Sequence, residues 1–157
     1  MPIIRIKTKI NAPIERVFDL ARCIDLHAAS MSENKEKAVA GKTKGLIDRD
    51  ETVTWEAVHF GIRQKLTSRI TIFNRPHQFR DSMVKGAFKR FDHDHFFEVK
   101  NSQTVMKDVF DYDSPLGIFG SIADRLFLEK YMTKLLKSRN KLIKTIAESD
   151  DWKKYIS

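Results

Sequence analysis

Cysteine is almost absent from this chain, since Cys23 is the only one among 157 residues. A single cysteine excludes a disulfide within the chain, and this scarcity is typical of proteins from a reducing compartment. The first residues, Met1 to Arg5, lack the cationic stretch, the apolar core and the small-residue cleavage site of a secretory signal. We therefore expect a cytoplasmic protein.

Long apolar runs and glycine-rich stretches are also missing. No apolar run approaches the roughly 20 residues that a membrane-spanning helix needs, and the chain has only 6 glycines and 4 prolines. No phosphate-binding glycine loop, nucleophile elbow, HExxH or CxxC pattern is present, so nucleotide hydrolysis, hydrolase chemistry and zinc-finger structure have no support. Internal repeats and linker-like segments are absent too. We expect one domain over residues 1–157.

Alternating apolar and polar residues indicate a series of strands. Residues 4–10 alternate isoleucine or threonine with basic residues, which is the period of a strand with one buried face. Pro13 and Glu15 then favour a helix of about three turns that ends near Cys23 to Asp25. A short helical turn or loop is expected at 27–34. Further strands are predicted at 36–42, 52–60, 62–73, 79–85, 88–99 and 104–112.

The last third of the chain, from Leu116 to about Ser149, has the pattern of one long two-faced helix. Its apolar stripe recurs at three- and four-residue steps and consists of Leu128, Met132, Leu135, Leu142 and Ile146. Because successive residues turn by about 100° around a helix, five lysines fall on the side opposite this stripe. They are Lys130, Lys134, Lys137, Lys141 and Lys144, and much of the chain's formal net charge of +8 is concentrated in this helix. We expect the apolar stripe to lie on a sheet and the lysines to face water or an anionic partner.

This order of elements predicts an α+β fold. Short hairpin connections make neighbouring strands antiparallel, and one apolar face of such a sheet must be covered. Only the terminal helix is long enough to cross the whole sheet. We expect a helix-grip architecture, in which a curved antiparallel sheet of six to seven strands wraps around the long C-terminal helix and a short helix follows the first strand. Such an arrangement commonly encloses a cavity.

The last predicted hairpin can be placed in register. If its turn centres on Asn101 and Ser102, four cross-strand pairs share one face, namely Phe91 with Tyr112, His93 with Phe110, His95 with Asp108, and Phe97 with Met106. The opposite face carries mostly charged side chains, so we expect the first face to point toward the helix. On an earlier strand, Trp55, Ala57 and His59 share a face, which we also expect to point toward the helix.

Three interpretations of His93, His95 and Asp108 follow from this register. Two histidines at i and i+2 with a carboxylate across the hairpin suit a zinc or iron ion. A histidine held by an aspartate in an apolar cavity also suits general acid–base chemistry on a carbonyl substrate. In the third interpretation, His95 and Asp108 hydrogen-bond to each other and give a pocket its few polar anchors. We favour the third, and expect no catalytic residue, no bound metal and no other cofactor.

The lysine side of the terminal helix has two interpretations as well. It is either a solvated face or a surface for anionic lipid headgroups, where each lysine is worth roughly 1 kcal/mol. Recognition of nucleic acid is not expected, because the aromatic residues are assigned to the inner face and are not interleaved with exposed basic residues.

The chain resembles the START-like helix-grip superfamily. The resemblance extends from Ile3 to about Ile146, and its most specific stretches are residues 51–57, residues 83–91 and the Pro115-Leu116-Gly117 start of the last helix. More narrowly, the chain is similar to the bacterial branch of polyketide cyclase/dehydrase and lipid transport (SRPBCC) proteins. This resemblance implies a deep cavity for a hydrophobic small molecule. It implies no particular reaction, because members include lipid carriers, hormone receptors and aromatic cyclases.

The function expected from the sequence is therefore binding of a lipid-like or aromatic molecule, hydrophobic or amphipathic, between the sheet and the C-terminal helix. The predicted ligand-binding residues are Trp55, Ala57, His59, Met83, Phe91, His93, His95, Phe97, Met106, Asp108, Phe110 and Tyr112. Two alternatives stay open. One is a cofactor-free cyclase, dehydratase or hydrolase that uses the cavity histidines, and the other is a peripheral protein that meets an anionic membrane through its lysines.

Overall fold

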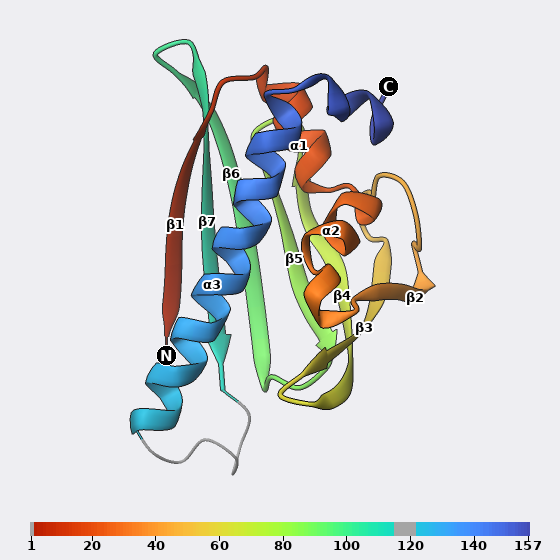
Figure 1. The fold of residues 1–157 in the computed structure, drawn as a ribbon, viewed down its shortest axis with the longest axis vertical. Helices are drawn as coiled ribbons and strands as arrows, with labels where there is room; N and C mark the ends of the chain where they lie inside the picture. The colour runs from red at the N-terminus through yellow and green to blue at the C-terminus, as the bar shows by residue number, and fades with distance from the viewer. Residues whose placement is uncertain (1, 115–121) are drawn as a thin grey trace.

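The computed structural model describes residues 2–114 and 122–157 (Figure 1). The strands are β1 (Ile3–Ile10), β2 (Lys37–Gly41), β3 (Thr52–His59), β4 (Ile62–Asn74), β5 (Gln78–Lys85), β6 (Arg90–Lys100) and β7 (Gln103–Asp113). The helices are α1 (Ile14–Ala21), α2 (Ile24–Ser30) and α3 (Ile122–Ala147), with short 3₁₀ helices at Ser32–Asn34 and Asp150–Lys154. The predicted start of the last helix, at Pro115 to Gly117, lies outside the described residues.

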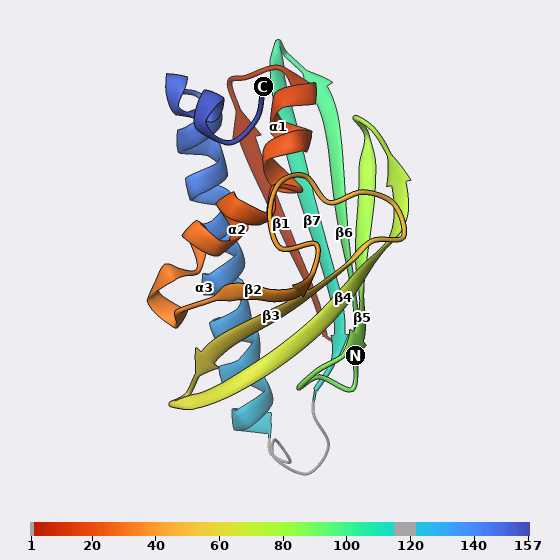
Figure 2. The ribbon, with the colours of Figure 1, turned by 90° about the vertical axis from the view of Figure 1, so that its right-hand side faces the viewer.

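The seven strands form one antiparallel sheet in the order β1-β7-β6-β5-β4-β3-β2. Figure 2 shows that α1, α2 and α3 all lie on the same face of this curved sheet. The predicted architecture of six to seven antiparallel strands, a long C-terminal helix and a short helix after the first strand is confirmed. The segment that follows α1 is more regular than predicted, because α2 makes a second short helix there.

The register of the β6–β7 hairpin is also as predicted. His95 lies opposite Asp108, and the other three predicted pairs are formed as well. The reason is the two-residue turn, in which Asn101 and Ser102 both have positive φ angles, of 52° and 62°. Two left-handed residues give the turn type whose twist matches that of the flanking strands, so the strands pair without a bulge.

The buried side of α3 differs in detail from the predicted apolar stripe. Leu128 and Ile146 are buried as predicted, whereas Met132, Leu135 and Leu142 are only half-buried. The centre of the buried side is instead formed by Leu136, Arg139, Asn140 and Ile143. The helix is therefore rotated slightly from the predicted orientation, because two polar residues in its middle have buried partners on the sheet. It ends at Ala147, two residues before the predicted end at Ser149.

Apolar side chains on the covered face of the sheet form two clusters. The first surrounds Phe18 of α1 and includes Phe79, Phe97, Met106 and Ile143. The second, toward the beginning of α3, consists of Ile4, Phe91, Phe110, Tyr112, Leu128 and Leu136. Within the residues described, no helix combines the length and the apolar character needed to span a membrane.

Candidate functional site

A layer of polar residues separates the two apolar clusters. On β6, His93 and His95 lie between Phe91 of one cluster and Phe97 of the other. On β7, Asp108 lies directly opposite His95. Neighbouring elements add polar residues at this level too. We call this layer the polar belt, and its members are Thr8 of β1, Asp81 of β5, His93 and His95 of β6, Asp108 of β7, and Arg139 and Asn140 of α3.

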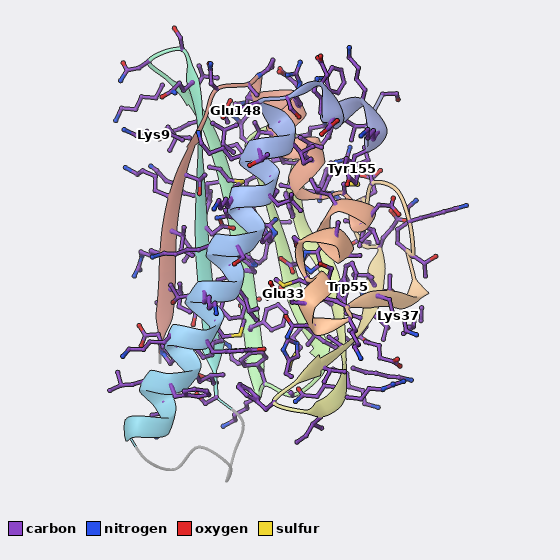
Figure 3. All side chains as sticks on the ribbon, in the orientation of Figure 1. Lys9, Glu33, Lys37, Trp55, Glu148 and Tyr155 are labelled. Atoms are coloured by element: carbon purple, nitrogen blue, oxygen red, sulfur yellow. The ribbon has the colours of Figure 1, made fainter. Side chains whose placement is uncertain are left out.

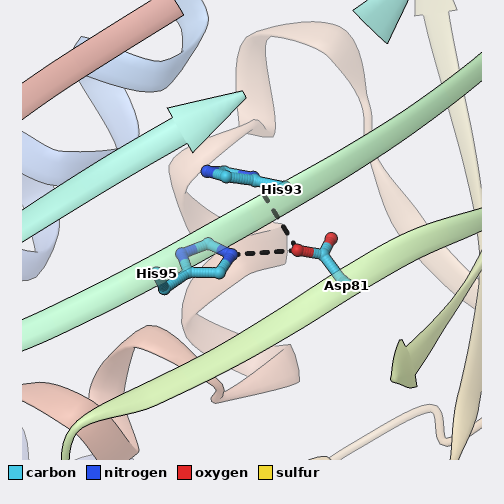
Figure 4. A group of neighbouring side chains, drawn as sticks. All are labelled: Asp81, His93 and His95. Carbon is cyan, nitrogen blue, oxygen red and sulfur yellow. Dashed lines mark hydrogen bonds and ion pairs between the residues drawn. The ribbon is translucent and has the colours of Figure 1, made fainter. Parts of the chain in front are cut away.

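Two carboxylates accept hydrogen bonds from the two histidines of the polar belt. His93 Nε2 lies 2.9 Å from Asp108 Oδ1, and His95 Nδ1 lies 3.1 Å from the same oxygen. On its other side, His95 Nε2 donates to Asp81 Oδ1 at 2.9 Å (Figure 4). The imidazole rings are close together, with centroids 3.8 Å apart. Each histidine thus lies between two aspartates.

The helix completes the polar belt from the opposite side. Asn140 Nδ2 donates to Asp108 Oδ2 at 2.6 Å, and Arg139 Nη1 lies 3.5 Å from Asp108 Oδ1. The Arg139 guanidinium also donates to the Asn140 side-chain oxygen at 2.9 Å and to the Ala21 carbonyl at 3.1 Å. Buried charges are tolerated when they are paired and hydrogen-bonded. Asp108, which is 1% exposed, meets that condition through contacts with two other elements, β6 and α3.

Burial and neighbouring charges set the protonation of this group. Burial alone raises the pKa of Asp81 and Asp108, but hydrogen bonds from the histidines and the Arg139 charge outweigh it. The Asp81 pKa falls to about 2 and the Asp108 pKa lies well below its usual value. Burial and the adjacent His95 lower the pKa of His93. Burial also acts against a charged His95, yet hydrogen bonds to Asp108 and Asp81 raise the pKa of that imidazole. His95 is the more readily protonated of the two.

A cavity of about 60 Å³ lies against the polar belt. Its floor is formed by Asp81, His93, His95 and Arg139. Its walls are mostly apolar and include Val53, Trp55, Ile70 and Phe79. The segment from Ala21 to His27, which runs from the end of α1 into α2 and which we call the α1–α2 segment, forms its roof and adds the apolar Ile24. A buried water needs at least roughly 10–15 Å³, so the cavity has room for a few waters or a very small molecule.

One side of the cavity is bounded by an aromatic pair. The His27 ring packs on Trp55, with centroids 4.5 Å apart, and Trp55 lies next to α2 in Figure 3. His27 Nε2 is held by Glu36 Oε1 at 2.9 Å. The roof is fixed to the following loop, because Ile24 N donates to the Gly45 carbonyl at 2.8 Å. The α1–α2 segment is therefore tied both to the sheet and to the loop before β3.

The structure distributes the predicted ligand-binding residues over several places. Trp55, His93 and His95 line the cavity, and Asp108 lies behind the two histidines. Ala57 is buried on the same face of β3 as Trp55, beyond the cavity. The Nδ1 atom of His59 is hydrogen-bonded to the hydroxyl group of Tyr131 on α3 at 2.7 Å. The remaining predicted residues belong to the apolar clusters and are Met83, Phe91, Phe97, Met106, Phe110 and Tyr112.

Sequence reasoning missed four residues that complete the polar belt, namely Thr8, Asp81, Arg139 and Asn140. Asp81 was detectable, because it precedes the predicted inward residue Met83 by two positions on one strand, and a period of two places both on one face. Arg139 and Asn140 lie where the apolar stripe is interrupted between Leu135 and Leu142. A charged residue at a position where the helix period requires burial indicates a buried partner.

A second polar feature lies in the other apolar cluster. The Tyr112 hydroxyl is buried and has no hydrogen-bond partner among the described residues. Burial raises the pKa of Tyr112 to about 12, and the charge of Glu129 on α3 adds to this shift. A buried hydroxyl of this kind costs free energy unless another group reaches it.

Comparison with known proteins supports the fold. Protein-family models and curated protein sequences give no match to this chain. Among solved structures, a protein from Thermus thermophilus has a TM-score of 0.70 and 20% identity, and the alignment covers 90% of this chain and 97% of that one.

Two further solved structures are similar over nearly their whole length. A START superfamily protein from Mycobacterium smegmatis has a TM-score of 0.69 at 11% identity, with coverage of 93% of this chain and 97% of that one. The ginseng major latex-like protein 151 from Panax ginseng has a TM-score of 0.66 at 13% identity, with coverage of 94% and 98%. Together with the sheet order and the long C-terminal helix, these neighbours show that the chain has the START-like helix-grip fold.

Proposed function

We propose that the protein binds a small apolar or amphipathic molecule in the cavity next to the polar belt. The observation that supports this most directly is the composition of the cavity. Apolar walls from α2, β3, β4 and β5 surround a floor on which Arg139, His93, His95 and Asp81 converge. Apolar walls with a few converging polar groups are typical of small-molecule sites, because the walls supply affinity and the polar groups fix orientation.

The lining indicates how such a molecule lies. Its apolar part packs between Trp55 and Phe79, which line the cavity from β3 and β5. Its polar end meets the floor, where Arg139 and the readily protonated His95 supply positive charge. A carboxylate or hydroxyl is the natural partner for the Arg139 guanidinium, while the charge of His95, whose ring nitrogens bond to Asp81 and Asp108, acts from a distance.

The size of the cavity limits the size of the ligand that it can hold. A volume of about 60 Å³ is small, because sites for drug-sized ligands measure roughly 300–1,000 Å³. A larger ligand therefore needs the α1–α2 segment to move away from the sheet. That segment contributes Arg22, Ile24 and His27 to the lining, and its contacts with Trp55 and with the Gly45 carbonyl must break for a larger ligand to enter.

Binding is better supported than turnover. All four ring nitrogens of His93 and His95 face a carboxylate, at distances from 2.9 to 3.8 Å. A general acid or base must bring a ring nitrogen within hydrogen-bond reach of the substrate. The histidines are thus committed to Asp81 and Asp108, and we propose that the protein has no intrinsic turnover.

A fluorescent naphthalene probe tests the binding proposal. Val53→Phe places a larger side chain on a cavity wall, and we expect it to weaken probe binding at least about tenfold, which corresponds to about 1.4 kcal/mol. Val58→Phe is the matched control, since Val58 is on the same strand but on its other face. Thermal unfolding of both variants checks that they are folded. Equal probe binding by both variants and the wild type would refute the cavity as the binding site.

A second candidate function, contact with an anionic membrane, rests on a separate observation. Lys130, Lys134, Lys137 and Lys141 are exposed as predicted and line one shallow groove on the outer side of α3. Lys144 departs from this set, because its ammonium donates to the Lys9 carbonyl at 2.7 Å and pairs with Glu148 at 2.8 Å.

Exposed aromatic residues adjoin this lysine groove. Phe60, at the β3–β4 turn, is 50% exposed and Phe127 on α3 is 54% exposed, and their ring centroids are 5.6 Å apart. Tyr131 packs against Phe60 with centroids 4.6 Å apart. Phe60 also has a positive φ of 55°, which is unusual for a bulky residue. Apolar groups beside basic residues are typical of proteins that bind the membrane interface. Sedimentation with anionic vesicles at low and high salt tests this contact.

A further inference from the structure

We propose that Asp81, His93 and His95 form a binding site for a divalent transition-metal ion such as Zn²⁺. Their potential ligand atoms, one from each residue, all lie within 4.8 Å of one another (Figure 4). The hairpin register alone places the histidines beside Asp108 and leaves out Asp81, which comes from a different strand. With Asp81 included, the donor set has two imidazoles and one carboxylate, which are ligands that zinc accepts.

The distances fit an ion placed between the three side chains. Asp81 Oδ1 lies 2.9 Å from His95 Nε2 and 3.8 Å from His93 Nδ1. Ligand atoms around a tetrahedral zinc ion are about 3.4 Å apart, given metal–ligand distances near 2.1 Å. The two separations from Asp81 lie on either side of this value, and the two histidine ligand atoms are within 4.8 Å of each other, so side-chain rotation can bring all three around one ion. The two rings are inclined by 34° and must turn further to direct both lone pairs at the ion.

The orientation of His93 supplies an independent argument. His93 Nε2 donates its proton to Asp108 at 2.9 Å, so a neutral His93 carries a lone pair on Nδ1. That lone pair faces the Asp81 carboxylate. Two electron-rich atoms that face each other are stabilised by a cation between them.

The outer contacts of the two histidines also have the form seen around metal ions. Histidines that bind metals nearly always donate their second ring nitrogen to a carboxylate, a carbonyl or water, which fixes the tautomer. Here Asp108 Oδ1 faces His93 Nε2 at 2.9 Å and His95 Nδ1 at 3.1 Å. One carboxylate therefore orients both proposed ligands, and Asn140 holds that carboxylate from the helix at 2.6 Å.

The site has an open side. The Asp81 side chain retains 26% exposure, and all three proposed ligands line the cavity. Three protein ligands leave a fourth position of a tetrahedral ion for water or another molecule. The ion would then lie on the cavity floor. This inference does not depend on the proposed binding of a small molecule, since the three side chains suffice to hold the ion.

Metal uptake by the full chain tests this inference. The protein is treated with a chelator, dialysed, and titrated with Zn²⁺, and separately with Co²⁺, in the absence of any organic ligand. We expect one ion per chain and the visible absorption of four-coordinate Co²⁺. Asp81→Asn keeps the size of the side chain but removes its negative charge, and it should abolish stoichiometric uptake. His77→Gln is the control, because His77 is an exposed histidine outside the polar belt.

A further measurement on the wild type guards against variants that fail to fold. X-ray absorption at the zinc edge should show two imidazole ligands and at least one oxygen ligand. Asp108 contacts the two histidine ligands but not the proposed ion. Asp108→Asn should therefore weaken zinc binding about 10- to 100-fold, whereas Asp81→Asn should abolish it. The inference is overturned by a wild type that takes up no stoichiometric ion, by uptake that Asp81→Asn leaves unchanged, or by an absorption spectrum without imidazole scattering.

Discussion

Asn140 of α3 donates to the Asp108 carboxylate of β7 across 2.6 Å. The same amide group lies 3.3 Å from the Thr8 hydroxyl on β1, so it joins the helix to two neighbouring strands at once. Apolar packing can be satisfied by several helix positions, whereas a buried hydrogen bond requires one. The polar belt therefore fixes the height and the rotation of α3 on the sheet.

The first prediction concerns Asp108, the centre of the polar belt. Asp108→Ala leaves Arg139 buried without its negative partner and removes the shared acceptor of two histidines. Breaking a buried ion pair on one side costs about 3–5 kcal/mol. We expect a loss of stability of that size in chemical unfolding.

Asp111→Ala is the matched control for this change. Asp111 is on the same strand but pairs with the partly exposed Arg90 at 3.2 Å, and such pairs contribute up to about 1 kcal/mol. Similar losses for Asp108→Ala and Asp111→Ala would show that the polar belt does not stabilise the fold.

Acid sensitivity is predicted for Asp19 on α1. Burial raises its pKa, but bonds from Arg75 and Arg22 at 2.7 to 3.0 Å outweigh this, so its pKa is lowered. Because the folded pKa lies below the unfolded value, this stabilisation is present above about pH 4 and is lost as the pH falls through the folded pKa. Asp19→Asn should cost roughly 1–3 kcal/mol at pH 7.

The difference in unfolding free energy between wild type and Asp19→Asn should therefore shrink as the pH falls below about 4. Asp150→Asn, at a side chain that is 96% exposed, should show no comparable change. A difference between wild type and Asp19→Asn that stays constant from pH 7 to pH 3 would contradict the assignment of these ion pairs.

Vesicle binding is predicted to depend on the exposed lysines of α3. Replacing Lys134, Lys137 and Lys141 by Gln should remove most binding to anionic vesicles, because each lysine near an anionic surface is worth about 1 kcal/mol. High salt should weaken wild-type binding in the same direction. The control variant carries the same replacement at three lysines that do not line this groove, namely Lys35, Lys37 and Lys42. If the wild-type protein does not bind anionic vesicles at low salt, the lysine groove is only a solvated face.

The sequence predicts most of the fold because its local signals agree with the tertiary structure. Alternation places the strands, the turn at Asn101 and Ser102 sets the register of the last hairpin, and His95 faces Asp108 as a consequence. The orientation of α3 was less predictable. An apolar stripe specifies which side is buried, but Arg139 is buried because of contacts with Asp108 and the Ala21 carbonyl, which are distant in sequence.

The candidate site was predictable only in part for the same reason. The two histidines follow from one hairpin, whereas Asp81 meets them through the neighbouring β5–β6 pairing, which lacks a short diagnostic turn. The residues that line the cavity, including Ile24, Val53 and Phe79, come from parts of the chain that are far apart in the sequence. The sequence could indicate a ligand cavity under a helix but could not show that the α1–α2 segment forms its roof.

Native mass spectrometry of the freshly purified full chain, followed by solvent extraction, shows whether the protein carries a small molecule. We expect a wild-type population with one small apolar or amphipathic molecule, lost on extraction and greatly reduced in Val53→Phe but not in Val58→Phe. A wild-type chain that shows only its own mass, and gains none after incubation with fatty acids and aromatic carboxylic acids, would contradict the proposed binding function.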